Sequence, residues 1–213
     1  MNNLPSVQPV TLKGTHVLLE PMTWSHLPDL CEVGLDPELW RWTPMAVRTP
    51  EEMRTYVEEV LNAQERGTAL PFVTIERKSG RIIGSTRYGN IDMVHKGVEI
   101  GWTWITKDWQ RTAINTEAKY LMLRHAFESL ECIRVQLKTD SLNERSRAAI
   151  LRLGAREEGI FRNHMMTYTG RVRHTAYYSI IIGEWPVVKV RLEDFLRRPS
   201  GKERPSPMEE FPC

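Results

Sequence analysis

The sequence predicts a mixed α/β fold, and three observations indicate it. Segments with strand and helix patterns occur in the order β-α-α-β-β-β-α-β-α-β-β. The early strands are joined by short turns, which is typical of antiparallel pairing, whereas strand–helix–strand crossings in the middle of the chain require some parallel pairing. Strands and helices do not alternate strictly, so the order differs from that of a doubly wound dinucleotide-binding sheet.

Each element is predicted from its own local pattern. The two early helices each have a proline near the start and a glycine at or just past the end. The first hairpin is predicted from Lys78-Ser79-Gly80 between two strand patterns. In chain order the elements are strand 16–21, helices 24–34 and 50–66, strands 70–76, 81–90 and 97–105, helix 115–130, strand 132–139, helix 143–153, strands 155–166 and 172–183, and helix 186–198.

The strand at residues 97–105 leads through a polar turn into the helix at 115–130. Asn115 and Thr116 are both good N-caps for this helix. Free backbone N–H groups and the helix dipole make such a start a site for anions. The turn contains Arg111 and no acidic residue, which favours an anionic ligand, and a well-capped helix without a ligand is the alternative. Apolar residues surround most of the helix, which predicts packing against a sheet.

Glu99 is the candidate general base, because strand alternation places it among small residues. Alternation puts Glu99 on one face of its strand with Gly101 and Thr103. The opposite face then carries the apolar residues, namely Val98, Ile100, Trp102 and Trp104. A β-bulge would change this assignment. The small side chains leave room for a ligand beside the carboxylate, and an ordinary surface carboxylate is the alternative.

The helix at residues 143–153 has two alternative N-caps. Ser141 and Glu144 match a capping box, which would leave Asn143 and Ser146 free to contact a ligand. If Asn143 is the cap, its role is structural.

Composition is that of an ordinary globular protein with one main core. The 213 residues are 41% hydrophobic and 26% charged, and the net charge of +2 is not that of a nucleic-acid binder. The chain has no apolar run near the ~18 residues of a membrane span and no secretion signal. The three cysteines have no metal-ligand spacing and cannot all pair, which indicates the reducing cytoplasm. We expect one domain over residues 10–198, with disordered tails at 1–9 and 199–213.

Three motifs follow one another in the second half of the chain. They are Glu99-Ile100-Gly101-Trp102, the turn into a helix at residues 110–115, and Asn143-Glu144-Arg145-Ser146 leading to Leu153-Gly154-Ala155. Together they resemble the GCN5-related N-acetyltransferases, and within them the branch named for ribosomal-protein-alanine acetyltransferases. The resemblance covers about residues 10–183. It implies a mixed, mostly antiparallel sheet of about seven strands flanked by helices.

The resemblance also implies an acetyl-coenzyme A site without a metal. Backbone amides of the turn would hold the diphosphate, and the pantetheine arm would pair with the end of the preceding strand and contact Asn143. The implied cofactor-binding residues are Trp104, Ile105, Thr106, Gln110, Arg111, Thr112, Ala113, Ile114, Asn115, Thr116 and Asn143. The residues implied on the acceptor side are Trp40, Trp42 and His164.

The implied chemistry is direct transfer of an acetyl group to an amine, with Glu99 and Ser146 as the catalytic residues. Glu99 would take the proton of the amine directly or through a water, and Ser146 replaces the usual acid. Many family members use a tyrosine seven residues after the asparagine, a position held here by Ile150. In the turn, Ala113 stands where glycine is usual and Asn115 where glycine or alanine is usual.

The leading hypothesis is therefore a cytoplasmic N-acetyltransferase that moves acetyl from acetyl-CoA to a primary amine, on a protein N-terminus or a small molecule. The alternative is a non-catalytic CoA-binding regulatory or interaction module on the same fold, favoured by Ala113 and the missing tyrosine at position 150. A nucleotide-binding protein is disfavoured because the chain lacks a P-loop lysine and a Gly-x-Gly-x-x-Gly turn. We expect no nucleic-acid or membrane partner, and the hairpin at 156–178 permits a homodimer without requiring one.

Overall fold

The computed structural model describes residues 7–198, so the prediction of disordered tails falls, apart from residues 7–9, outside the described part of the chain. The strands are β1 (Leu12–Lys13), β2 (Val17–Pro21), β3 (Leu70–Glu76), β4 (Ile82–Asp92), β5 (Gly97–Ile105), β6 (Arg134–Asp140), β7 (Arg156–Met166) and β8 (Val172–Ile181). The helices are α1 (Leu27–Gly34), α2 (Pro50–Glu65), α3 (Ala113–Arg124), α4 (Glu144–Leu153) and α5 (Trp185–Arg197). Short helical turns are η1 (Trp24–His26), η2 (Pro37–Leu39), η3 (Lys107–Trp109) and η4 (His125–Ser129).

The strands form a single sheet in the order β1-β2-β3-β4-β5-β6-β8-β7. Every neighbouring pair is antiparallel except β5 and β6, which are parallel. The predicted mixed, mostly antiparallel sheet is therefore confirmed. It has eight strands among the described residues, where about seven are expected, because the two-residue β1 adds to the edge.

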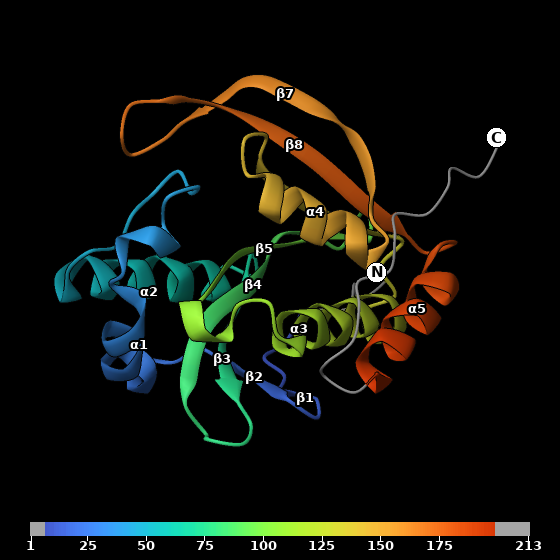
Figure 1. The fold of residues 1–213 in the computed structure, drawn as a ribbon, viewed down its shortest axis with the longest axis horizontal. Coiled ribbons are helices and arrows are strands. Elements are labelled where there is room, and N and C mark those ends of the chain that lie inside the picture. Colours follow the sequence, from blue (N-terminus) through green and yellow to red (C-terminus); the bar gives the residue numbers. More distant parts are fainter. Residues whose placement is uncertain (1–6, 199–213) are drawn as a thin grey trace.

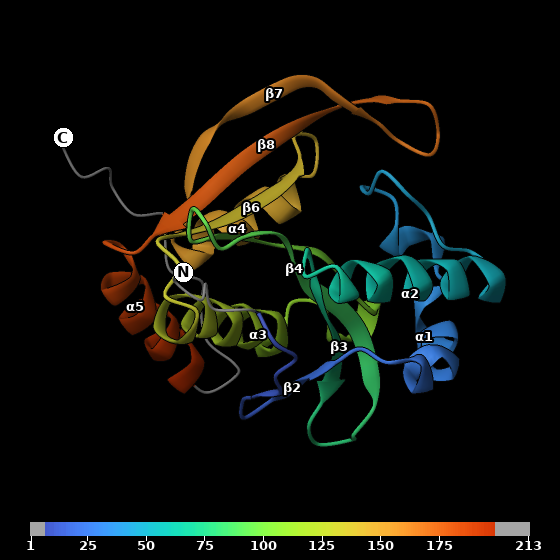
Figure 2. The same cartoon turned by 180° about the vertical axis from the view of Figure 1, so that it is seen from behind.

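Helices cover both faces of the sheet. On one face, α3, α4 and α5 pack over the main core, to which the strands β1 to β6 and β8 contribute buried residues (Figure 1). On the other face, α1 and α2 pack over a smaller cluster with β3, β4 and the end of β5, called here the α1–α2 core. The long β7–β8 hairpin arches away from α4 and reaches toward the side of the molecule that carries α2 (Figure 2).

The pairing between β5 and β6 stops early. The two strands pair only at Gly97–Arg134, Val98–Val135 and Glu99–Gln136. Beyond these pairs β5 continues to Ile105 with no strand partner on its β6 side. Its backbone groups on that side are an open edge inside the sheet.

Helix α3 begins earlier than predicted. Thr112 has an extended backbone and its hydroxyl accepts the N–H of Ile114 at 3.3 Å, so Thr112 is the N-cap. The predicted caps Asn115 and Thr116 lie inside the first turn. The predicted end at residue 130 is close to the observed one, because the α-helix continues as the π-helical turn η4 to Ser129. The predicted packing against a sheet is confirmed, since nearly all of α3 is buried.

Glu117 ties α3 to the start of β2. Its carboxylate is buried and accepts the backbone N–H groups of Thr15, His16 and Val17 at 2.7 to 2.8 Å. Three bonds from N–H groups to one carboxylate fix the chain entering the sheet against the first turns of the helix.

A β-bulge interrupts β5. Ser85 of β4 pairs with Trp104, but Arg87 pairs with Gly101, so two residues of β5 stand opposite one residue of β4. The bulged residue Trp102 has φ 49°, in the left-handed region.

This bulge reverses three predicted side-chain directions, those of Trp102, Thr103 and Trp104. The ring of Trp102 lies over Gly89, which pairs directly with Glu99 and therefore shares its face. A Cβ at Gly89 would lie 2.4 Å from that ring, so glycine is needed for the close approach. Thr103 points the other way and hydrogen bonds Thr86 at 2.8 Å. The prediction that Thr103, and not Trp102, accompanies Glu99 is wrong, because the extra residue shifts the alternation by one.

Candidate functional site

The turn before α3 has the geometry of an anion site. Gln110 donates from Nε2 to the carbonyl of Ile105 at 2.7 Å, which closes the turn against the end of β5. The exposed Arg111 takes the left-handed conformation, with φ 65°. Thr112 caps the N–H of Ile114, and because the first turn has no acidic residue the helix dipole is not compensated by a negative charge there. Ala113 and Asn115 do not have positive φ, so no glycine is needed for conformational reasons at either position.

Asn115 supplies evidence that a ligand fits this turn. Its Oδ1 atom is buried and has no hydrogen-bond partner in the described part of the chain. Buried polar atoms are nearly always satisfied, so this acceptor fits a ligand that brings a donor group. Beside it, Thr116 accepts a hydrogen bond from Arg152 of α4 at 3.0 Å, which adds positive charge near the helix start, whereas Ile114 is buried in the main core.

The open edge of β5 is the second part of the site. Trp104 is buried in the α1–α2 core, with its ring 5.8 Å from the ring of Trp40. Thr106 donates its N–H to the carbonyl of Ile83 on β4 at 2.8 Å. The side chains at this end of the strand therefore point into the protein, and the backbone facing β6 is what remains for an extended ligand.

The start of α4 decides between the two predicted caps. Asn143 is the N-cap, and its Oδ1 accepts the N–H of Ser146 at 3.1 Å. Asp140 Oδ1 accepts the N–H of Leu142 at 3.0 Å, which shapes the turn before the helix. The amide oxygen of Asn143 thus has a structural role. Its amide nitrogen and the Ser146 hydroxyl make no hydrogen bond within residues 7–198.

Glu99 lies at the centre of a buried polar cluster. Its side chain is 2% exposed, and Oε2 accepts from Asn90 at 2.7 Å and Gln136 at 3.3 Å, with Lys138 Nζ at 3.0 Å. Three donors on one oxygen hold the carboxylate in one orientation. The other oxygen, Oε1, points toward Gly101, where an added Cβ would lie 3.1 Å away. We call these four polar residues the Glu99 cluster.

Aromatic rings surround the Glu99 cluster. Lys138 Nζ lies 5.4 Å from the ring centroid of Trp102 and 5.9 Å from that of Tyr177. The guanidinium of Arg87, from β4, lies 3.9 Å from the centroid of the same Trp102 ring. These distances are those of cation–π contacts. The Trp102 ring therefore contacts both cations, Arg87 and Lys138, on the face of the sheet that carries Glu99.

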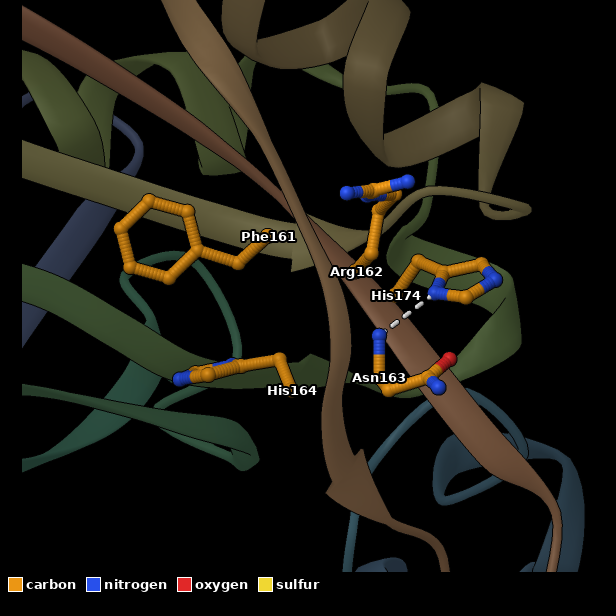
Figure 3. A pocket seen from close by; sticks show the side chains of 5 residues that line it. All are labelled: Phe161, Arg162, Asn163, His164 and His174. Carbon is orange, nitrogen blue, oxygen red and sulfur yellow. Dashed lines mark hydrogen bonds between the residues drawn. The ribbon is translucent and has the colours of Figure 1, made fainter.

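The β7–β8 hairpin brings His164 to the same place. Asn163 has φ 51°, and this irregularity puts Phe161 and His164 on one side of β7, with Asn163 and His174 on the other (Figure 3). A hollow of about 790 Å³ runs along this part of the strand. His164 Nδ1 lies 3.1 Å from the hydroxyl of Thr175. Burial and the nearby charge of Lys138 lower the pKa of His164.

The loop between α1 and α2 contacts the β7–β8 hairpin through a hydrogen bond to Arg173 of β8. Trp40 is buried, and its Nε1 donates to the carbonyl of Gly34 at 2.8 Å, so its indole anchors the core. Trp42 is half-buried, and its carbonyl accepts from Arg173 of β8 at 3.2 Å. Of the two tryptophans, Trp42 is the one whose side chain is partly exposed.

Lys119 lies under the bulge on the opposite face of the sheet. It is 6% exposed, and its Nζ donates to Thr103 at 2.6 Å and Thr86 at 3.1 Å. It forms no ion pair among the residues described. Burial lowers the pKa of Lys119 from 10.5 to about 7.

The predicted residues thus fall into two groups. One contains the turn before α3, the end of β5 and the start of α4, including Ser146. The other contains Glu99 and His164, whose charges interact, together with Trp42 at its border. No hydrogen bond or ion pair joins Ser146 to Glu99 in residues 7–198.

Sequence reasoning missed several residues of the second group. Gln136 and Lys138 alternate with buried Val135 and Leu137 in β6, so strand periodicity contains their signal. Arg87 and Tyr177 have no comparable local signal, because their positions depend on strand pairing across long stretches of chain.

Within residues 7–198, no group of three or more His, Cys, Asp and Glu side chains is arranged to hold a metal ion. No helix in the same range has the length and apolar character needed to span a membrane.

Comparison with known proteins gives consistent matches. A model of the acetyltransferase (GNAT) domain matches residues 16–156. The chain is 33% identical over 172 residues to YdaF of Bacillus subtilis, a protein provisionally named as a ribosomal N-acetyltransferase, covering 79% of this chain and 91% of that one. A GCN5-related N-acetyltransferase structure from Brucella melitensis superposes with a TM-score of 0.83 at 28% identity, over 90% of this chain and 87% of that one. Mycobacterium smegmatis RimJ, solved with a CoA disulfide, has the same fold, with a TM-score of 0.75 at 23% identity over 85% and 90% of the two chains.

Proposed function

Because the chain belongs to the GNAT family of N-acetyltransferase enzymes, we propose that it transfers an acetyl group from acetyl-CoA directly to a primary amine, with Glu99 as the general base. The observation that carries this proposal is the oriented carboxylate of Glu99, at the last β5 residue before the unpaired part of that strand. A base and an open strand edge on one strand are what direct transfer to an amine requires.

Three parts of the chain fit the acetyl donor. The start of α3, with Arg111 and no acid in its first turn, suits the diphosphate. The backbone of β5 beyond Glu99 suits the extended arm, and the unpartnered Oδ1 of Asn115 suits a donor group of the ligand. When bound, acetyl-CoA supplies an activated acyl group. The free amide nitrogen of Asn143 is available to contact it from the α4 side.

Glu99 has the arrangement of a base that acts on a cationic acceptor. Oε2 is held by three donors, and Oε1 faces the space above Gly101. An ammonium group placed there meets a carboxylate of fixed orientation, which accepts its proton directly or through a water. The proton must leave before the nitrogen can attack a carbonyl carbon. Ser146, one turn into α4, is the hydroxyl on the cofactor side that we assign as proton donor to the departing thiolate.

We assign the acceptor to protein or peptide N-termini rather than to free small amines. The support is the name of YdaF, which refers to ribosomal N-acetylation. The acceptor would enter between the Trp42 loop and the β7–β8 hairpin, beside His164.

The test is an acceptor panel that reports free coenzyme A. Peptides with Ala, Ser or Met at the N-terminus are compared with polyamines and aminoglycosides, and a thermal-shift series with acetyl-CoA runs in parallel. We expect a higher melting temperature with acetyl-CoA and thiol release with at least one peptide. A thermal shift without thiol release from any acceptor would support the non-catalytic CoA-binding module instead. No shift at millimolar acetyl-CoA would contradict the cofactor assignment.

A further inference from the structure

Arg87 is a partly buried cation without an anionic partner. Its Nε atom is buried and makes no hydrogen bond, and no ion pair to Arg87 forms within residues 7–198. The side chain is held in place by stacking on Trp102 at 3.9 Å. Charged groups in protein interiors are normally paired, because desolvating an unpaired ion is costly.

The groups around Arg87 do not supply that partner. Tyr56 and Glu59 of α2 and Glu99 of β5 are the groups that favour its charge, and burial opposes it, lowering the pKa of Arg87. None of the three lies within ion-pair distance of Arg87 in the described structure. Glu99 is already bound to Lys138 at 3.0 Å.

A second arginine increases the positive charge of the same face. Arg173 is 5% exposed, donates to the hydroxyl of Thr175 and to the carbonyl of Trp42, and forms no ion pair with a carboxylate in residues 7–198. The carboxylates of Glu59 and Asp140 act on these arginines from a distance, but neither carboxylate forms an ion pair with Arg87 or Arg173 in residues 7–198. An anionic group on the acceptor would therefore find a cation without a direct partner on this face.

The register of β4 and β5 places the Cα atoms of Arg87 and Glu99 near each other on one face of the sheet. Arg87 pairs with Gly101, and Gly89 pairs with Glu99. The two Cα positions are therefore offset by two strand residues, which is ~6.7 Å along the strand.

We propose that the acceptor carries an anionic group, a carboxylate or a phosphate, close to its amine, and that Arg87 binds this group while Glu99 receives the amine. The proposal rests on the acetyl-transfer function above and narrows its substrate class. Among the N-terminal acceptors proposed above, the anionic group would be an acidic side chain near the peptide N-terminus, and a phosphorylated small amine tests whether the same chemistry is recognised outside a peptide.

Matched acceptor pairs test the proposal. One pair is a peptide that begins Ala-Glu and the same peptide beginning Ala-Gln, and the other is 3-aminopropyl phosphate and 3-aminopropanol. For each pair, kcat/KM is measured with wild type, Arg87→Met and the control Arg66→Met, which changes an exposed arginine at the end of α2. We expect wild type and Arg66→Met to prefer one anionic member about 10- to 100-fold, and Arg87→Met to lose that preference.

Binding without acetyl-CoA separates this proposal from the proposed function. Calorimetric titration of the same pairs reports the preference even if no acetyl transfer occurs. A preference in binding that Arg87→Met removes, without turnover, supports the anion site and contradicts the transfer reaction. Equal binding and equal kcat/KM within both pairs for the wild type overturn the proposal, whether or not Arg87→Met folds. Equal losses for both members of a pair in a folded Arg87→Met also overturn it.

Discussion

Replacing Lys119 with methionine should change how the stability of the protein depends on pH. Methionine has a similar length and no charge, so it removes the titrating amine and keeps most of the buried volume. Burial without a carboxylate lowers the pKa of Lys119 from 10.5 to about 7. The unfolded chain therefore binds one more proton than the folded chain between these values. Stability rises with pH across this window in the wild type, and this contribution is absent from the variant.

The magnitude follows from the two pKa values. At pH 7.5 the unfavourable contribution of Lys119 is about 4 kcal/mol, and at pH 9.5 it falls to about 1.4 kcal/mol. Its hydrogen bonds to Thr103 and Thr86 return about 1 kcal/mol each. Lys119→Met should therefore be more stable than wild type by about 2 kcal/mol at pH 7.5, and of similar or slightly lower stability at pH 9.5.

Urea unfolding at pH 7.5, 8.5 and 9.5 measures this difference. The control is Lys13→Met, which changes an exposed lysine on β1 and should follow the wild type at every pH. Between pH 7.5 and pH 9.5, the free energy of unfolding of the wild type should rise by about 2.5 kcal/mol relative to that of Lys119→Met. Parallel stability curves for wild type and Lys119→Met would refute the reasoning, because the amine would then titrate alike in the folded and unfolded chains.

Three further changes test other parts of the structure. Glu99→Gln should lower kcat by about 100-fold or more and leave acetyl-CoA binding unchanged, measured by steady-state rates and titration; unchanged turnover removes Glu99 from the mechanism. Asn143→Ala removes the cap on Ser146, so it should lower stability by about 1 kcal/mol and reduce the thermal shift caused by acetyl-CoA; an unaltered shift contradicts the assigned contact. Glu117→Gln places an amide against the N–H groups of residues 15–17, so urea unfolding should show a loss of about 2–4 kcal/mol, and a loss below 1 kcal/mol would argue against the tie between α3 and β2.

Local patterns were enough to predict much of the fold. The apolar helix before β6 is packed on the sheet as predicted, and the hairpin around Lys78-Ser79-Gly80 joins β3 and β4. Both depend on residues that are neighbours in the chain. The choice between Ser141 and Asn143 as cap of α4 was open, because each has the chemistry of a cap and only the turn geometry selects one.

The site depends on features that no local pattern contains. The bulge at Trp102 arises from the pairing offset between β4 and β5, and it reverses Trp102, Thr103 and Trp104 together. The contacts of Arg87 and Lys119 follow from that reversal, one on each face of the sheet. Such contacts join residues far apart in sequence, so they become visible only with the register of the strands.

The early end of the β5–β6 pairing divides the sheet into two parts, β1–β5 and β6–β8, which are joined only by the short parallel pairing that ends at Glu99. Both parts nevertheless contribute to the single main core, which contains Ile100 from one part and Leu137 and Tyr178 from the other. The two parts cannot separate without exposing that core, so we expect the unpaired edge of β5 to be held in place before a ligand binds. The conformational entropy needed to order this strand edge is therefore lost when the protein folds, and not when a ligand binds. An extended ligand would pair with β5 as an additional strand does. The backbone amides of β5 beyond Glu99 should then exchange their hydrogens with solvent more slowly when the ligand is bound.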